Sequence, residues 1–218
     1  MITIIDNYDS FTYIIAQYFA ATGVAVEVKK NDMVTAQSVI DRAPMGLVLS
    51  PGPGRPEESG NSFDILAAMR GKVPVLGICL GHQIIARSMG VDVNAAARIS
   101  HGKASPITHH GQGLFYNIKQ NTKVGRYHSL SIDKNTINKS LKIVAETADE
   151  MAEAMALEDR SAQIYGVQFH PESIMRGWYD DDPEFRPHMS KSQAKLGSQD
   201  KGGFSYFRND AVAASIRI

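Results

Sequence analysis

The sequence of 218 residues contains a single cysteine, Cys79, so it cannot form an internal disulfide. It also has no net charge, because Lys and Arg number 23 and so do Asp and Glu. No excess of basic residues is therefore present to hold a nucleic-acid backbone. No apolar run approaches the length of a membrane span, and the N-terminus lacks the pattern of a secretory signal. We expect a cytoplasmic protein of a reducing compartment with neither a nucleic-acid nor a membrane partner.

Strand-like and helix-like patterns alternate up to about residue 90. Short apolar runs predict strands at residues 2–6, 24–30, 46–50 and 73–78. Apolar residues at helical spacing predict helices at residues 10–23, 35–42 and 61–71. This alternation indicates an α/β fold, a doubly wound and mostly parallel sheet with helices on both faces.

Beyond about residue 95 the predicted elements are short strands without long helices between them. They fall at residues 113–119, 122–129, 140–147, 153–158 and 163–173. We expect them to form an antiparallel extension packed on the same core. From residue 177 an acidic cluster is followed by Ser, Lys and Gly without any period, which is typical of a poorly ordered segment. The sequence thus predicts one domain of residues 1–176 and an atypical tail of residues 177–218.

The single cysteine lies where an apolar run turns into a helix-like pattern. Residues 77–81, GICLG, have the form Gly-x-nucleophile-x-Gly, which is typical of a sharp strand-to-helix turn. A helix beginning at Leu80 or Gly81 would direct its free N–H groups at Cys79, where they favour a thiolate and can hold an oxyanion. A lone cysteine is more often a buried structural residue. In this context we interpret Cys79 as a nucleophile.

A base and an orienting group for that thiol are present in the segment VQFHPES. His170 and Glu172 flank Pro171, which favours extended backbone before it, and residues two apart in extended backbone face the same side. A His-Pro-Glu triplet taken alone is usually a surface turn. Together with the turn at Cys79, it predicts a Cys-His-Glu arrangement.

Six segments in order resemble the class I glutamine amidotransferases, and more narrowly the glutaminase subunit of anthranilate synthase and aminodeoxychorismate synthase. They are DNYDSFTY, SPGPGRPEESG, GICLGHQ, HGKASPITHHGQGLF, RYHSL and GVQFHPESIM, and the resemblance covers residues 1 to about 176. It implies that Cys79 is the nucleophile and that His170 and Glu172 complete the triad. It also implies contacts with glutamine or its oxyanion from Gly52, Pro53, Gly54, Leu80, Gln83, Ser129 and Leu130.

Spacing alone leaves simpler interpretations open for two of these contacts. The PGPG loop follows a predicted strand, so Gly52 and Gly54 would let the backbone approach a substrate, yet a plain turn has the same composition. Gln83 lies on the first turn of the expected helix, where a solvated residue is equally common. Ile14 departs from the family, which usually has Asn at this position.

The resemblance implies hydrolysis of L-glutamine and delivery of ammonia to a chorismate-binding synthase subunit of the tryptophan or folate branch. Mg²⁺ is then expected only in that partner, and no cofactor in this chain. A free-standing γ-glutamyl or peptide hydrolase of the same fold, or a catalytically silent assembly subunit, are the alternatives. The sequence contains neither G-x-G-x-x-G nor a phosphate-binding P-loop, which argues against nucleotide binding.

Four of the histidines show no metal-binding spacing. No thiolate and no His-x-x-x-His pattern accompanies them: His101, His109, His110 and His128. We therefore predict no metal site in this chain. We interpret His128 as a structural support for the HSL segment and the other three as loop residues.

Overall fold

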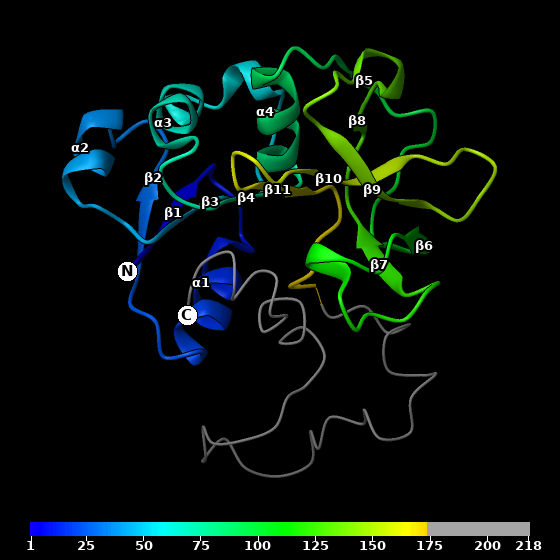
Figure 1. The fold of residues 1–218 in the computed structure, drawn as a ribbon, viewed down its shortest axis with the longest axis horizontal. Helices are drawn as coiled ribbons and strands as arrows, with labels where there is room; N and C mark the ends of the chain where they lie inside the picture. The colour runs from blue at the N-terminus through cyan, green and yellow to red at the C-terminus, as the bar shows by residue number, and fades with distance from the viewer. Residues whose placement is uncertain (174–218) are drawn as a thin grey trace, which may run out of the picture.

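The computed structural model describes residues 1–173. The predicted tail of residues 177–218, and the end of the predicted 1–176 domain, lie outside the described residues. A nine-stranded sheet forms the centre of the molecule, in the order β2-β1-β3-β4-β11-β10-β9-β6-β7 (Figure 1). Its strands are β1 Ile2–Asp6, β2 Val26–Lys30, β3 Gly46–Leu49, β4 Val75–Ile78, β6 Lys103–His109, β7 Lys123–Arg126, β9 Lys142–Thr147, β10 Ala154–Asp159 and β11 Ile164–Val167. A second sheet pairs β5 (Val93–Ala95) with β8 (Leu130–Ile132).

The helices cover both faces of the parallel half of the sheet, as the sequence predicts. They are α1 Thr12–Ala21, α2 Ala36–Asp41, α3 Ser62–Met69 and α4 Leu80–Ser88, with short 3-10 turns η1 Pro56–Glu58, η2 Gly113–Phe115 and η3 Lys134–Thr136. In Figure 1, α1 lies on one side of the sheet and the other three α-helices lie on the opposite side. Because neighbouring residues of a strand point to opposite faces, Ile4 packs in the cluster of α1 and Ile5 in that of α3 and α4. The doubly wound α/β fold is confirmed.

The antiparallel extension is also confirmed, but its membership differs from the prediction. Strands β10, β9, β6 and β7 pair antiparallel in succession. Strand β11 instead pairs parallel with β4 and antiparallel with β10, so it joins the two halves of the sheet. The prediction that residues 163–173 belong to the extension alone was therefore wrong. The carboxyl end of β11 comes to lie beside the carboxyl end of β4, which precedes Cys79.

Two further predictions in this region were wrong. Residues 113–119 form the 3-10 turn η2 and a following turn rather than a strand, because Gly113 and Asn117 adopt φ angles of +59° and +60°, which a strand does not accommodate. Residues 103–109 form β6, so His109 is a strand residue and not a loop residue. Its ring is buried and stacks on Phe115 with centroids 4.7 Å apart.

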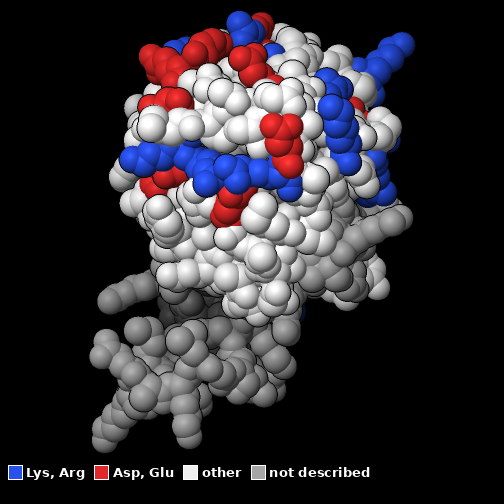
Figure 2. Space-filling view, turned by 90° about the vertical axis from the view of Figure 1, so that its left-hand side faces the viewer, with Lys and Arg blue, Asp and Glu red and all other residues white. Residues whose placement is uncertain are grey.

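The edge strand β2 carries charges of both signs. Figure 2 shows basic and acidic side chains interspersed on the face where β2 and α2 lie. Glu27 lies 3.5 Å from both Lys29 and Arg42, and Lys30 lies over the ring of Tyr8. Exposed ion pairs contribute little stability, but basic side chains on an edge strand discourage pairing with another chain. Within residues 1–173, no helix has the length and apolar character needed to cross a bilayer.

Candidate active site

Cys79 occupies a sharp turn between β4 and α4. Its backbone has φ +51° and ψ −103°, a conformation that costs free energy in any residue other than glycine. Hydrogen bonds hold it on both sides: its N–H donates to the carbonyl of Val167 (2.8 Å), and its carbonyl accepts from the N–H of Gln83 (3.1 Å). The predicted strand-to-helix turn is confirmed, with α4 beginning at Leu80. Cys79 is therefore the N-cap of α4, directly before the N–H groups that have no carbonyl partner within the helix.

The two glycines of this turn allow close packing of α4 on the sheet. A Cβ added to Gly81 would lie 2.8 Å from the Cβ of Leu49 on β3 and would also clash with the Leu49 carbonyl. A Cβ added to Gly77 would lie 2.6 Å from Cδ1 of Ile85 and would clash with the backbone of Gly81. Both positions therefore need the absence of a side chain, which is the physical basis of the Gly-x-Cys-x-Gly pattern.

His170 and Glu172 follow β11 and form a buried pair. Nδ1 of His170 lies 2.7 Å from Oε1 of Glu172. The backbone N–H of His170 donates to the carbonyl of Gly125 at 3.0 Å. Burial lowers the pKa of His170, but hydrogen bonds to Cys79 and Glu172, with the negative charges of both groups, outweigh it and raise the pKa to about 10. The imidazole is therefore protonated at neutral pH. A protonated imidazole favours the thiolate form of a neighbouring cysteine.

Two aromatic rings hold the imidazole of His170 in place. The ring centroids of Phe11 and Tyr127 lie 5.4 Å and 5.1 Å from that of His170, both in edge-to-face geometry. The hydroxyl of Tyr127 is 2.9 Å from Oγ of Ser173. These contacts come from α1's N-terminus and from the end of β7, so sequence spacing alone did not reveal them. They restrict the ring to an orientation that keeps Nδ1 on Glu172.

The loop that contains Gly52 packs directly on the turn at Cys79. A Cβ added to Gly52 would lie 2.5 Å from the Asn7 carbonyl oxygen and 2.8 Å from Cδ2 of Leu80. Glycine is required here because the backbone approaches Asn7 and Leu80 too closely for any side chain. Pro53 and Gly54 are exposed farther along the loop, and Gly54 has φ +78°. The structure thus brings Gly52 and Leu80 together, while the glutamine contacts of Gly52, Pro53, Gly54 and Leu80 stay predictions.

Asn7 ties this loop to the rest of the sheet edge. Its N–H and its side-chain amide donate to Oγ and to the carbonyl of Ser50, both at 2.8 Å. Its Oδ1 accepts from Asn31 (3.0 Å) and Ser62 (2.9 Å). All four residues are buried. The DNYDS segment therefore fixes the start of the loop that contains Gly52, a role that sequence reasoning missed.

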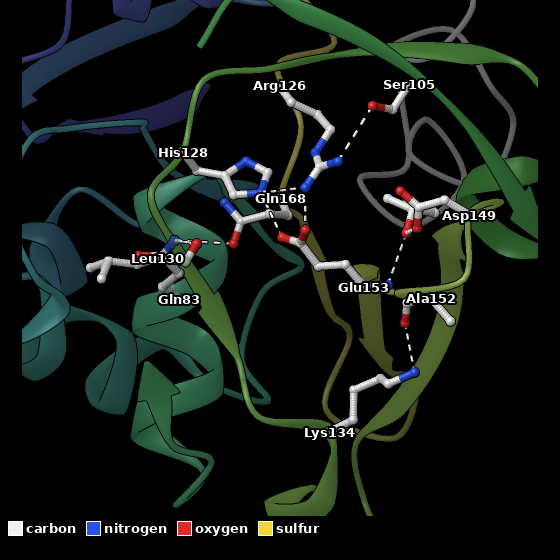
Figure 3. Close-up of polar contacts among 11 residues, drawn as sticks. Gln83, Ser105, Arg126, His128, Leu130, Lys134, Asp149, Ala152, Glu153 and Gln168 are labelled. Atoms are coloured by element: carbon white, nitrogen blue, oxygen red, sulfur yellow. Dashed lines mark hydrogen bonds and ion pairs between the residues drawn. The ribbon is translucent and has the colours of Figure 1, made fainter. Parts of the chain in front are cut away.

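Two glutamines connect the thiol with the segment of residues 128–130. Gln168, which is fully buried, donates its amide N–H to Sγ of Cys79 at 3.7 Å. Its Oε1 accepts from Nε2 of Gln83 at 3.0 Å, and the same Nε2 donates to the Leu130 carbonyl at 3.1 Å (Figure 3). Gln83 and Leu130 are therefore bonded to each other, and Ser129, which precedes Leu130, is exposed. The contacts of all three with glutamine stay predictions. Sequence reasoning missed Gln168, although its place two residues before His170 puts both on one side of an extended segment.

The described residues contain no group of three or more His, Cys, Asp or Glu side chains placed to hold a metal ion. The arrangement that they do contain is a thiol on a strained turn, a protonated imidazole, a buried carboxylate and N–H groups at a helix start. These groups suit nucleophilic attack on a carbonyl carbon, with the imidazole as proton donor.

The sequence model of the family "Glutamine amidotransferase class-I" matches residues 3–181. The chain belongs to this family and is a class I glutamine amidotransferase. Among curated proteins, it is 45% identical over 175 residues to aminodeoxychorismate synthase component 2 of Klebsiella aerogenes, covering 80% of this chain and 92% of that protein. It is 43% identical to aminodeoxychorismate/anthranilate synthase component 2 of Bacillus subtilis (80% and 89% covered). It is 42% identical to anthranilate synthase component 2 of Pseudomonas putida (80% and 90% covered).

Solved structures agree on the fold. A Thermoplasma acidophilum protein described as part of a GMP synthase superimposes with a TM-score of 0.73 at 24% identity, covering 99% of this chain and 94% of that one. A glutamine amidotransferase of Thermotoga maritima superimposes with a TM-score of 0.63 at 17% identity, covering 78% and 75%. At these identities the likeness supports the class I glutamine amidotransferase fold and no finer assignment.

Proposed function

We propose that this chain is a glutaminase subunit that hydrolyses L-glutamine through Cys79, His170 and Glu172 and delivers ammonia to a chorismate-using synthase subunit. The observation that carries this proposal is the buried His170–Glu172 pair at 2.7 Å, with the pKa of His170 raised by the Cys79 and Glu172 side chains. A histidine that stays protonated beside a thiol at a helix start is suited to stabilise a thiolate and to protonate a leaving nitrogen.

In the first half of the reaction, the sulfur of Cys79 attacks the side-chain amide carbon of glutamine. Negative charge develops on the amide oxygen, and the N–H group of Leu80 with those of the loop at Gly52 would hold it. His170 gives its proton to the amide nitrogen, the carbon–nitrogen bond breaks and ammonia leaves. The product on the chain is a glutamyl thioester at Cys79.

In the second half, His170 is neutral and accepts a proton from water. The resulting hydroxide attacks the thioester carbon, the carbon–sulfur bond breaks and glutamate leaves, so Cys79 and protonated His170 are restored. Glu172 stays ionised throughout, because its role is to orient the ring and to stabilise its charge. The sum is glutamine and water to glutamate and ammonia, and the proposal assigns no cofactor to this chain.

A second subunit is proposed because ammonium, the protonated form that prevails in water, is not a nucleophile. Ammonia has to reach its acceptor before it is protonated, which requires an adjoining subunit. The relatives are named as component 2 of anthranilate and of aminodeoxychorismate synthases. These names favour a synthase partner over a free-standing γ-glutamyl hydrolase or a silent assembly subunit. In this proposal any Mg²⁺ belongs to the partner that binds chorismate.

The test uses the purified full chain, with glutamine as substrate and released glutamate as the measured product. We expect measurable hydrolysis that Cys79→Ser eliminates, and capture from source lysate of a chorismate-binding subunit. No glutamate from the chain, whether tested by itself or with that subunit, would instead support a silent assembly role. Full activity without any partner would support the free-standing hydrolase.

A further inference from the structure

A buried ionic cluster lies behind the segment of residues 128–130. Arg126 ends β7, His128 follows two residues later, and Glu153 precedes β10. One oxygen of the Glu153 carboxylate forms an ion pair with Nη2 of Arg126, and the other lies 2.6 Å from Nε2 of His128 (Figure 3). The side chains are only 4%, 2% and 12% exposed for Arg126, His128 and Glu153. The two oxygens of one carboxylate therefore hold Arg126, just before the segment, and His128, its first residue.

Glu153 is the carboxylate that forms the close ion pair with Arg126. The remaining contacts of Arg126 are long: 3.4 Å from Nη1 to Oγ of Ser105 and 3.5 Å from Nη2 to Nε2 of His128. Its Nε has no hydrogen-bond partner within residues 1–173. Asp149, whose pKa is lowered by a hydrogen bond from Thr147 and also by the charge of Arg126, is the other acidic group that faces the cluster. A buried guanidinium without a paired carboxylate is strongly unfavourable, so Glu153 determines where Arg126 can lie.

Each of the three residues of the segment accepts a hydrogen bond at its backbone carbonyl. The carbonyls of His128 and Ser129 accept from the N–H groups of Ser100 (3.1 Å) and Ala96 (2.8 Å). The Leu130 carbonyl accepts from Gln83, which is also bound to Gln168 at the thiol of Cys79. Only His128 is held by a buried charged side chain. Gln83 therefore links this segment to the thiol, and Glu153 is the charged group that holds it at His128.

We propose that Glu153 is a positioning residue for glutamine: through Arg126 and His128 it fixes the segment of residues 128–130 against the thiol without itself touching the substrate. This inference rests on the proposed glutaminase function, in which Ser129 and Leu130 contact glutamine. Glu153→Gln keeps the size of the side chain but removes the charge that holds Arg126. The segment then shifts, whereas neither the turn at Cys79 nor the His170–Glu172 pair has a direct bond to Glu153 among the described residues.

The experiment compares the wild-type chain with Glu153→Gln and with the matched control Glu146→Gln. Glu146 lies in the preceding strand β9 and forms a half-exposed ion pair with Lys134 at 2.7 Å, with no contact to Arg126 or His128 among its described bonds. We expect Glu153→Gln to raise the KM for glutamine about tenfold or more, with a smaller change in kcat, whereas Glu146→Gln behaves like the wild type.

A second readout needs no turnover. Because Cys79 is the only cysteine, alkylation of the chain by iodoacetamide reports on this thiol alone. We expect the alkylation rate without glutamine to be the same in Glu153→Gln and in the wild type. The glutamine concentration that gives half-protection should rise about as much as KM. A purely structural defect would instead change the alkylation rate in the absence of glutamine.

Unchanged KM and unchanged half-protection in a folded Glu153→Gln chain would overturn the inference, as would a loss confined to kcat. If Glu153→Gln does not fold, the double variant Arg126→Met with Glu153→Met removes the buried charges together, and it should fold and show the same rise in KM. A wild-type chain that neither hydrolyses glutamine nor is protected by it would refute the proposed function itself. Unchanged KM and half-protection in Glu153→Gln, with a wild-type chain that hydrolyses glutamine, would refute only the role of Glu153 and not the proposed glutaminase function.

Discussion

Replacing Glu172 by Gln should lower the pH at which His170 loses its proton. The substitution keeps an oxygen that can accept from Nδ1 of His170, now 2.7 Å from the carboxylate, but it removes the negative charge. Glu172 is buried, and its Oε2 has no hydrogen-bond partner among residues 1–173, so little else screens its charge from the imidazole. The change therefore isolates the electrostatic contribution of the carboxylate.

The size of the effect follows from the separation of the charges. Two unit charges about 4 Å apart attract by about 4 kcal/mol at an effective dielectric constant of about 20. Since about 1.4 kcal/mol corresponds to one pH unit, the His170 midpoint should fall by about 2 to 3 pH units from its wild-type value of about 10. Near neutral pH, a smaller fraction of His170 is then protonated in the variant. The rate of glutamine hydrolysis should therefore fall, although less than in His170→Ala, which removes the proton donor altogether.

The measurement is a titration of the imidazole signals by NMR in a chain with ¹³C-labelled histidine, with His170 assigned from the signal missing in His170→Gln. Glu57→Gln is the control, because Glu57 is an exposed carboxylate that pairs with Arg87. A wild-type midpoint near the ordinary histidine value of about 6.5 would refute the electrostatic reasoning. So would equal midpoints in the wild type and Glu172→Gln.

The same pKa has a consequence for stability. The pKa of His170 is raised in the folded chain, so its contribution to the free energy of unfolding is fully present below about pH 6.5 and is lost as the pH rises through about 10. In Glu172→Gln, the pH range over which this stability is lost should move to lower pH. Urea denaturation of the wild type and of Glu172→Gln at several pH values measures the free energy of unfolding of each.

Three further outcomes are expected. Cys79→Ser should eliminate glutamine hydrolysis while the circular dichroism spectrum and partner binding persist, because a hydroxyl is not ionised by a helix start and an imidazole; residual turnover above a small fraction of wild type contradicts the nucleophile. Gly81→Ala should lower the free energy of unfolding in urea by about 2 kcal/mol, since its Cβ would overlap Leu49; an unchanged midpoint contradicts the close packing. Adding the chorismate-binding subunit should raise the glutaminase rate, most of all with chorismate present, by stabilising the competent loops; equal rates with and without it favour a free-standing hydrolase.

The features that depend on local pattern could be predicted from the sequence. The alternating apolar runs predicted the parallel half of the sheet, and the glycines around Cys79 predicted the turn before α4. The spacing of His170 and Glu172 was enough to predict that they face the same side. Each of these follows from neighbouring residues and from the period of a strand or helix.

The remaining features depend on contacts between distant parts of the chain. Gln168 meets Cys79 across 89 positions, and Glu153 meets His128 across 25, so no local pattern predicts either contact. The parallel place of β11 depends on its pairing with β4, far earlier in the sequence. The prediction of a strand at residues 113–119 was wrong because it rested on their apolar residues alone. The positive φ angles of Gly113 and Asn117 belong to turns and not to a strand.

The late position of β11 in the sequence also has a consequence for biosynthesis. Strands β4 and β10, between which β11 lies, leave the ribosome first, and each has an unpaired edge until residues 164–167 emerge. The thiol is thus made well before the imidazole that would activate it; at about 5–20 residues per second the delay is several seconds. In the proposed mechanism, a nascent chain without His170 has no proton donor for the leaving nitrogen. Insertion of β11 between β4 and β10 closes the described sheet, and the same insertion brings His170 to Cys79.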